Sequence, residues 1–215
     1  ILMTMKKLVS VFCAITFAAF LFNGCDDDPD YSIGGSPSEL GNKGVIITSS
    51  SQPIAGISGF SATVTSVEDG VSVFEGHAVI TNNALKQILS NVPGLNISED
   101  NVSVSGVKVK FTDKGIENKY PFYQGILVKF NAKVGDTYPV KDSDTERKVI
   151  YKSTTDDFDY AFYKIKVIEV EHEINFHGLK KINYWVNHKF GLVKVQFELD
   201  NGETIAMPFY SGSLK

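Results

Sequence analysis

The chain has 215 residues, of which 43% are hydrophobic and 12% aromatic, and a formal net charge of −4. This length suffices for one large domain or two small ones, and the composition is typical of a folded globular protein. A slightly acidic chain with no run of Lys and Arg excludes general nucleic-acid binding, which requires a concentrated basic surface.

Residues 1–24 have the pattern of a signal peptide. Lys6 and Lys7 precede an apolar run over residues 8–22, and a positive segment followed by a short apolar run is the layout of a secretory signal. A transmembrane helix needs about 20 apolar residues, so we expect export and cleavage. Cleavage would remove both lysines and no acidic residue, so the processed chain would carry 25 acidic residues and 19 basic ones.

The segment Leu21-Phe22-Asn23-Gly24-Cys25 resembles the lipobox that lipoprotein signal peptidase recognises. The resemblance implies cleavage between Gly24 and Cys25 and lipidation of the Cys25 thiol. Acyl chains contribute about 0.8 kcal/mol per buried methylene, so two or three chains anchor a protein stably. The alternative is an ordinary signal peptide with an incidental cysteine, but that class prefers a small residue where Phe22 lies. The predicted partners are therefore a membrane and the lipoprotein-processing and sorting machinery.

The acidic run over residues 26–30 follows Cys25 directly. It resembles the surface-export signal of Bacteroidota lipoproteins, which implies an outer-membrane lipoprotein exposed at the cell surface. An Asp directly after the cysteine also resembles the inner-membrane retention signal of enterobacteria, which implies the periplasmic face of the inner membrane. Both locations remain open at this point.

Residues 25–44 are rich in Asp, Gly, Ser and Pro, which predicts a flexible tether. We expect a single β-rich domain over residues 45–215, and we consider a second boundary near residue 133. The only cysteines of the chain are Cys13 and Cys25, so this domain relies on its hydrophobic core and not on disulfide bonds.

The domain sequence alternates between apolar and polar residues, which predicts strands. The predicted strands span residues 60–66, 71–80, 102–111, 126–132, 148–153, 160–173, 182–186, 192–199 and 204–210. Within 102–111 the apolar side changes, which predicts a bulge. Turn residues occur at 69–70, 113–115 and 200–202. One helix is predicted over residues 84–92, capped by Asn82 or Asn83 and ended by Pro93-Gly94.

Many short strands, one helix and no βαβ repeat predict a mainly β fold: a curved antiparallel sheet or half-barrel with one short helix. A β-sandwich is the alternative. The motifs Val134-Gly135-Asp136-Thr137-Tyr138, Tyr184-Trp185 and Phe190-Gly191-Leu192-Val193-Lys194 resemble uncharacterised Bacteroidota lipoproteins, and the resemblance implies a curved antiparallel sheet. Similar curved sheets occur in the periplasmic lipoprotein-carrier family.

No constellation of residues predicts catalysis, a metal site or a cofactor. The densest titratable cluster is Glu169, Glu171, His172, Glu173 and His177. On a strand the three glutamates share one face while His172 points to the other, so the cluster predicts a solvated acidic face. Asp142-Ser143-Asp144 lacks the glycine and the distant glutamate of an EF-hand calcium loop. No serine lies in a Gly-x-Ser-x-Gly motif.

Aromatic residues are the remaining candidates for ligand contact, because aromatic side chains can line a groove for a sugar or an apolar ligand. The aromatic residues that could line such a groove are Tyr120, Phe122, Tyr123, Tyr160, Phe162, Tyr163, Tyr184 and Trp185, and the leading candidates are Tyr123, Tyr184 and Trp185. The alternative is that these side chains are core or cross-strand partners, as aromatic residues in strands more often are. Since Tyr184 and Trp185 are neighbours on a strand, they point to opposite faces, and we expect one of them to be exposed. The favoured function is non-enzymatic ligand binding or scaffolding in the cell envelope. The alternatives are a carrier of an acyl or apolar ligand and an envelope hydrolase.

Overall fold

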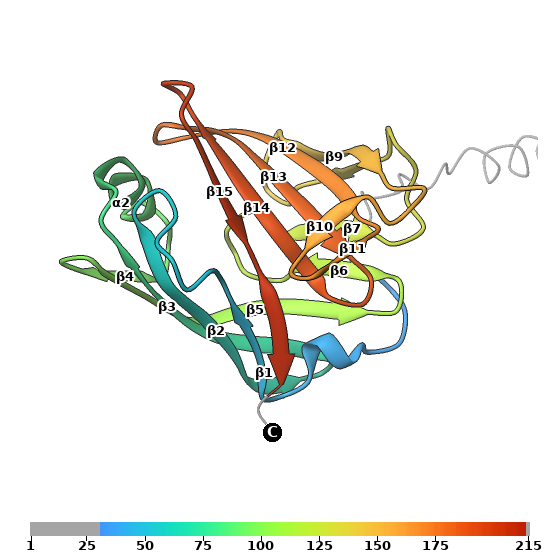
Figure 1. Ribbon diagram of the computed structural model, residues 1–215. Coiled ribbons are helices and arrows are strands. Elements are labelled where there is room, and N and C mark those ends of the chain that lie inside the picture. The colour runs from blue at the N-terminus through green and yellow to red at the C-terminus, as the bar shows by residue number, and fades with distance from the viewer. Residues whose placement is uncertain (1–30, 214–215) are drawn as a thin grey trace, which may run out of the picture. The chain divides into compact units, whose positions relative to one another are not determined.

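The computed structural model describes residues 31–213, and the predicted signal peptide with Cys25 lies outside this range. Within residues 31–213 the fold is mainly β, with antiparallel strands that form a strongly curled half-barrel and one α-helix (Figure 1). The predicted fold class is therefore confirmed.

The described residues form a first antiparallel sheet of eight strands, in the order β16-β1-β2-β3-β5-β6-β7 with β4 paired to β5. Its strands are β1 (Val45–Thr48), β2 (Ile57–Glu68), β3 (Val71–Ile80), β4 (Leu95–Ser98), β5 (Asn101–Thr112), β6 (Gly115–Asn118), β7 (Gly125–Lys129) and β16 (Tyr210–Ser213).

A second sheet contains six antiparallel strands of the 31–213 range, in the order β15-β14-β13-β12-β9-β8, and a separate hairpin pairs β10 with β11. Their bounds are β8 (Thr137–Pro139), β9 (Glu146–Lys152), β10 (Phe158–Tyr160), β11 (Tyr163–Ile165), β12 (Ile168–Phe176), β13 (Leu179–Asn187), β14 (Gly191–Leu199) and β15 (Thr204–Pro208). The chain passes from the first sheet to the second between β7 and β8.

Helix α2 (Asn83–Leu89) and the 3-10 turn η1 (Glu39–Gly41) are the helical elements of the described chain. The side chain of Asn82 caps α2 by accepting the backbone N–H of Leu85. The apolar face of α2 buries Leu85 and Ile88 in the core. No helix in the part of the chain that the structure describes is long and apolar enough to span a membrane.

The predicted turns and the predicted bulge are confirmed. Residues 69–70, 113–114 and 200–203 connect β2 to β3, β5 to β6 and β14 to β15. In the β3–β5 pair, Phe74 faces Val107 and Glu75 faces Ser105, so Gly106 is the extra, bulged residue. Its φ of 74° lies in the left-handed region that glycine adopts without strain.

The prediction of one long strand over residues 160–173 is wrong. The chain turns back at Ala161 and Phe162, so that β10 pairs with β11, and β12 starts only at Ile168. The turn contains no Gly, Asn or Asp but uses Ala161 at a φ of 51°, and local composition therefore carried no turn signal. The strand predicted over 204–210 is also interrupted, at Phe209, where the chain passes from the second sheet to the first.

The inner faces of the two sheets pack on each other through hydrophobic side chains. One buried cluster joins Ile80 and Val102 of the first sheet to Ile182 and Ile205 of the second. Another cluster joins residues such as Phe74 and Val128 to Val149 and Val170. The space between the sheets is thus occupied by the protein's own core.

Residues 32–44, here called the N-terminal strap, pack on the first sheet. The expectation of a flexible tether over residues 25–44 is therefore wrong for these residues. Ile33 is only 3% exposed. The Ser38 N–H donates to the carbonyl oxygen of Phe111 at 3.0 Å, and the Ser72 hydroxyl donates to the carbonyl oxygen of Gly41 at 2.7 Å. The composition of the segment is that of a tether, but a few apolar side chains and many backbone hydrogen bonds hold it in place.

Candidate functional site

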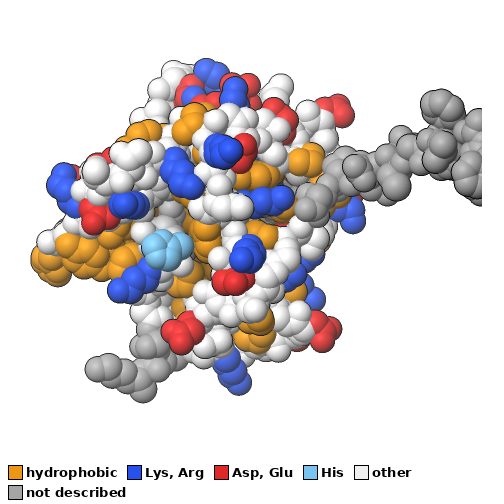
Figure 2. All heavy atoms as spheres, turned by 90° about the vertical axis from the view of Figure 1, so that its right-hand side faces the viewer, with side chains coloured by type: hydrophobic (Ala, Val, Ile, Leu, Met, Phe, Trp, Pro, Cys, Tyr) orange, Lys and Arg blue, Asp and Glu red, His pale blue; other side chains and the backbone are white. Residues whose placement is uncertain are grey.

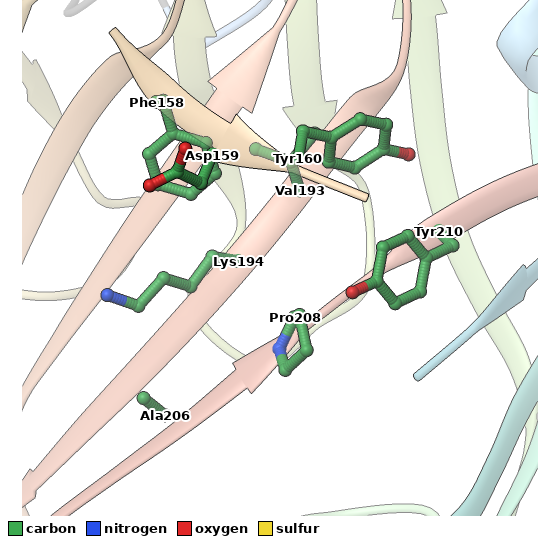
Figure 3. Close-up of a pocket in the computed structure, with 8 residues that line it drawn as sticks. All are labelled: Phe158, Asp159, Tyr160, Val193, Lys194, Ala206, Pro208 and Tyr210. Atoms are coloured by element: carbon green, nitrogen blue, oxygen red, sulfur yellow. The ribbon is translucent and has the colours of Figure 1, made fainter. Parts of the chain in front are cut away.

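The outer face of the second sheet carries a pocket of about 220 Å³, here called the aromatic pocket (Figure 3). The hairpin strand β10 covers one side of it, strands β14 and β15 form its floor, and the start of β16 closes it. Eight residues line it: Phe158, Asp159, Tyr160, Val193, Lys194, Ala206, Pro208 and Tyr210. Aromatic rings together with an ammonium and a carboxylate suit a small ligand that has both an apolar face and polar groups.

A bulge in β14 places two neighbouring residues at the pocket floor. Trp185 of β13 pairs with Lys194, while Val186 pairs with Leu192, so Val193 is the extra residue. A bulge re-aims side chains that would otherwise point to opposite faces. Lys194 also pairs with Pro208 of β15, so that Trp185, Lys194 and Pro208 form a row across three strands.

A cluster of aromatic rings holds the hairpin against the sheet. The Tyr160 ring lies 4.8 Å from the ring of Phe190 and 5.5 Å from that of Tyr210, centroid to centroid. Burial raises the pKa of Tyr160, and hydrogen bonds with Ser211 oppose that shift. At the tip of the hairpin Phe162 is fully exposed. The rings of the cluster thus fix the pocket wall, whereas the tip projects into solvent.

Two charged side chains at the pocket are held by neighbours. The Lys194 Nζ lies 3.9 Å from the centre of the Trp185 ring, in a cation–π contact. The Asp159 carboxylate forms an ion pair with Lys164 at 3.2 Å, across the β10–β11 hairpin. The Lys194 ammonium thus lies beside an aromatic ring, where it can hydrogen-bond to a ligand, whereas the Asp159 side chain is largely exposed at the pocket edge.

Of the three leading aromatic candidates, only Trp185 lies beside the aromatic pocket, whereas Tyr160, which the sequence also suggested, lines it. It is 9% exposed and packs with Val193 and Lys194. Tyr184 points to the opposite face and packs between the two sheets with Tyr123. The expectation that Tyr184 or Trp185 is exposed is wrong, because the hairpin and Lys194 cover one face and the first sheet covers the other.

Tyr123 and Tyr184 belong to a polar cluster inside the protein, centred on Arg147. Arg147 is 1% exposed, and its guanidinium donates to the carbonyl oxygens of Ile126 at 3.0 Å and Tyr123 at 2.5 Å. No carboxylate of the described residues forms an ion pair with the guanidinium. Burial lowers its pKa, whereas the nearby Tyr184 hydroxyl acts to raise the pKa of the guanidinium. The guanidinium therefore connects β9 to β7 and to the loop before it.

His172 faces Arg147 across the β9–β12 pair and is fully buried. Its Nε2 lies 2.9 Å from the Thr145 hydroxyl, whereas its Nδ1 has no hydrogen-bond partner within residues 31–213. Burial, and then the positive charge of Arg147, lower the pKa of His172 from 6.5 to about 3. The imidazole is thus neutral at physiological pH.

The glutamates of β12 form an outer face, as the alternation predicted. Glu171 forms an ion pair with Lys181 at 3.2 Å, and Glu169 accepts a hydrogen bond from Asn183 at 2.8 Å. His172 lies on the inner side, so these side chains do not converge. In the 31–213 range no group of three or more His, Cys, Asp or Glu side chains could hold a metal ion.

A second, wider hollow of about 450 Å³ lies on the outer face of the first sheet. Its lining is mostly polar: Thr63, Thr65, Glu75, Gly76, His77, Asn96, Ser103, Val104 and Ser105. Alternate residues of an antiparallel sheet face solvent, and Thr63, Thr65, Glu75 and His77 follow that alternation. Phe, Tyr and Trp are absent from this lining, so the hollow is a weaker candidate for ligand contact.

Sequence reasoning missed Asp159, Lys194, Pro208 and Tyr210 as pocket residues. The interpretation of residues 160–173 as one strand removed the hairpin that forms the wall, and a bulge at Val193 cannot be seen in the alternation of β14. One available signal was the density of aromatic residues at 158–163 and 184–190, which exceeds what a single buried face requires.

Comparisons of the chain with protein-family models, with curated proteins and with solved structures found no match. The assignment of function therefore depends on the geometry described above and on the sequence pattern before residue 31.

Proposed function

We propose that this chain is a membrane-anchored, non-enzymatic binding protein of the cell envelope that is tethered through a lipidated Cys25. Its ligand site is the aromatic pocket, and its ligand class is a small saccharide unit. The observation that supports the site most directly is the combination of Phe158, Tyr160 and Tyr210 with Lys194 and Asp159 around one pocket.

The size and chemistry of the pocket support this ligand class. A volume of about 220 Å³ is below the range of about 300–1,000 Å³ that is typical of sites for drug-sized ligands, and it suits a single sugar ring. The C–H face of a sugar packs on aromatic rings, and its hydroxyl groups bind charged side chains and phenolic oxygens. An acyl carrier would instead need an open apolar cavity between the sheets, where core side chains lie.

A fluorescence titration tests the site, because Trp185 is the only tryptophan of the chain and lies under Lys194. We expect at least one member of a panel of neutral, acidic and amino sugars to change the Trp185 emission in a saturable manner. Tyr210→Ala removes one ring of the pocket and should weaken binding about tenfold, since such a contact contributes about 1.4 kcal/mol.

The matched control is Phe162→Ser, which removes an exposed ring from the same hairpin without changing the pocket lining. Its affinity should equal that of the parent chain. Equal losses in the two variants, or no saturable change with any sugar, would contradict the assignment of the pocket.

The anchor is tested separately, by labelling with palmitate in an exporting bacterial host. We expect the label to be incorporated in the parent chain and to be lost in Cys25→Ser. Retention of the label in Cys25→Ser would refute the anchor while leaving the pocket assignment intact.

A further inference from the structure

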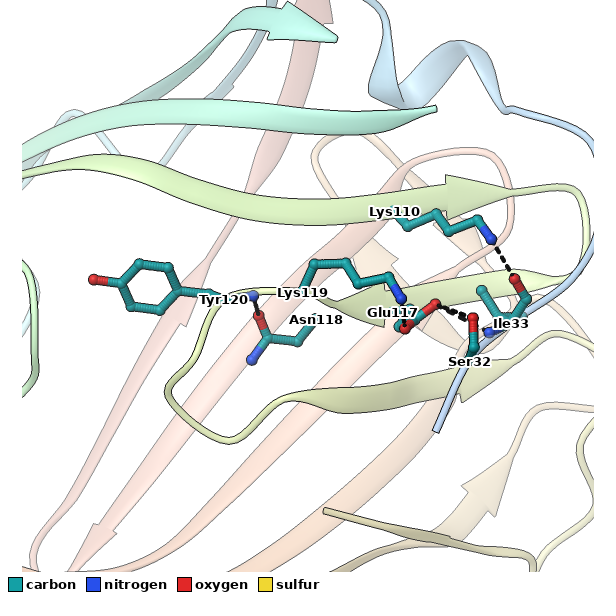
Figure 4. Close-up of polar contacts among 7 residues, drawn as sticks. All are labelled: Ser32, Ile33, Lys110, Glu117, Asn118, Lys119 and Tyr120. Atoms are coloured by element: carbon teal, nitrogen blue, oxygen red, sulfur yellow. Dashed lines mark hydrogen bonds and ion pairs between the residues drawn. The ribbon is translucent and has the colours of Figure 1, made fainter. Parts of the chain in front are cut away.

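Only a short segment separates the proposed anchor, Cys25, from the first residue that is bonded to the folded body. Glu117 of β6 is 1% exposed, and its carboxylate accepts the N–H of Ile33 at 3.0 Å and the Ser32 hydroxyl at 3.3 Å (Figure 4). The ammonium of Lys110 donates to the carbonyl oxygen of Ile33 at 2.6 Å. Lys119 forms an ion pair with Glu117 at 2.5 Å. These charge-assisted bonds hold the first residues of the N-terminal strap.

The surrounding packing makes the attachment specific. A Cβ on Gly115 would lie 2.5 Å from the Cδ1 of Ile33, so only glycine lets Ile33 approach β6 this closely. Farther along the strap, Ser36 donates its N–H to the Asp113 carboxylate, and Asp113 donates its own N–H to the Ser36 carbonyl oxygen, each at 2.9 Å. The strap is thus fixed along the β5–β6 hairpin from Ser32 onward.

This attachment limits how far the body can move from a lipid anchor. Seven Cα–Cα steps separate Cys25 from Ser32, and at about 3.6 Å per step they span at most about 25 Å in any conformation. A tether that ran freely to Gly44 would reach about 70 Å. A domain of this length has a diameter of about 40 Å, so the anchored body cannot turn an arbitrary face toward the bilayer.

Resting on the anchor of the proposed function, we propose that the face around Ser32 and the β5–β6 hairpin docks on the lipid surface. Lys110, Lys114, Lys119 and Lys129 lie on β5, on the hairpin turn and on β6–β7, against the acids Asp113 and Glu117. These four bases against two acids give +2, but Asp26, Asp27, Asp28 and Asp30 add four negative charges between the anchor and Ser32. The short attachment, and not charge, therefore turns this face toward the lipid surface. The strap and β7 lie at the right of Figure 1, on the side where Figure 2 shows lysine side chains.

The test uses the full lipidated chain in vesicles of phosphatidylethanolamine and phosphatidylglycerol that contain a nitroxide-headgroup lipid. The processed chain has no cysteine beyond Cys25, so Lys114→Cys and Asn201→Cys each accept one fluorescent label, the second on the β14–β15 turn. We expect strong quenching at position 114 and weak quenching at position 201.

Two variants test whether the short attachment of the strap orients the body on the bilayer. A flexible Gly-Ser segment about as long as the strap, inserted between Asp30 and Tyr31, should reduce quenching at position 114 to the level of position 201. Glu117→Ala combined with Lys110→Met should do the same by releasing the strap, and Trp185 emission reports that the body stays folded.

Equal quenching at both positions in a chain that floats with vesicles would overturn the docking proposal alone. Quenching at position 114 that persists after the Gly-Ser insertion would show that the short tether does not orient the body, and would also count against it. A chain that does not float refutes the anchor, and with it the docking, which separates the two failures.

Discussion

Acidification offers a direct test of the buried imidazole of His172. The folded protein holds this side chain without solvent contact and next to the positive charge of Arg147. The pKa of His172 is therefore about 3 in the folded protein, against 6.5 for a solvent-exposed histidine. Because the unfolded chain takes up this proton more readily than the folded protein, the free energy of unfolding falls as the pH drops.

The sign and the size follow from these two values. The contribution of neutral His172 is fully present above pH 6.5 and is lost progressively as the pH falls toward 3. One pKa unit corresponds to about 1.4 kcal/mol, so acidification to about pH 4 should remove about 3 kcal/mol. That is a large part of the roughly 5–15 kcal/mol that stabilises a typical domain.

The assay is urea unfolding at about pH 7 and about pH 4, followed by the emission of Trp185. His172→Gln removes the titrating group. Between the two pH values, the free energy of unfolding of this variant should therefore fall by about 3 kcal/mol less than that of the parent chain. Acidic groups also titrate in this range; the pKa of Glu198, for example, is lowered mainly by its hydrogen bond from Lys180. Because these groups are present in both chains, their contributions cancel when the two losses of stability are subtracted. His77→Gln, on the exposed face of β3, should behave as the parent does. Parallel losses in the parent and in His172→Gln would refute the reasoning.

Two further changes test the interior and the strap by urea unfolding. Arg147→Met removes the side-chain donor to the buried carbonyl oxygen of Ile126 and one of two donors to that of Tyr123, which keeps the Asn118 amide. We expect a loss of about 1–3 kcal/mol, because removal of the buried charge offsets part of the cost. An unchanged free energy of unfolding would contradict the stabilising role assigned to these hydrogen bonds. Gly115→Ala places a Cβ 2.1 Å from the Val128 carbonyl oxygen and should cost about 2–3 kcal/mol and expose the strap to proteolysis. Gly202→Ala, at a φ of 82° in open space, is the control, with an expected loss of about 1 kcal/mol; equal losses in both would exclude the clash as the cause.

The elements that the sequence predicted well are those with local causes. Alternation of apolar and polar residues predicted β3 and β14, and the side chain of Asn82 marked the start of α2. The bulge near Gly106 was visible because the apolar side changes within one strand. Each of these features depends on a few neighbouring residues, so a single sequence suffices to find it.

The elements that the sequence missed have distant causes. The N-terminal strap resembles a tether in composition, and it is ordered by Glu117 and Lys110, which lie about 80 residues away in the chain. The β10–β11 hairpin turns at Ala161 without a turn residue, because packing of Tyr160 on Phe190 and Tyr210 compensates the strain. Long-range contacts of this kind leave no local pattern.

The candidate site follows the same division. Aromatic content pointed to a ligand surface, and Trp185 indeed lies beside the aromatic pocket. The pocket itself, however, forms where the last strand leaves the second sheet: Phe209 packs into the core, and the next residue, Tyr210, lines the pocket and pairs with Thr48 of β1. Neighbouring residues of an extended chain point to opposite faces, so one crossing segment both joins the two sheets and forms the pocket edge. Through Tyr210, the pocket of the second sheet is connected to β16 and β1 of the first sheet, the same sheet that carries the proposed lipid-facing hairpin.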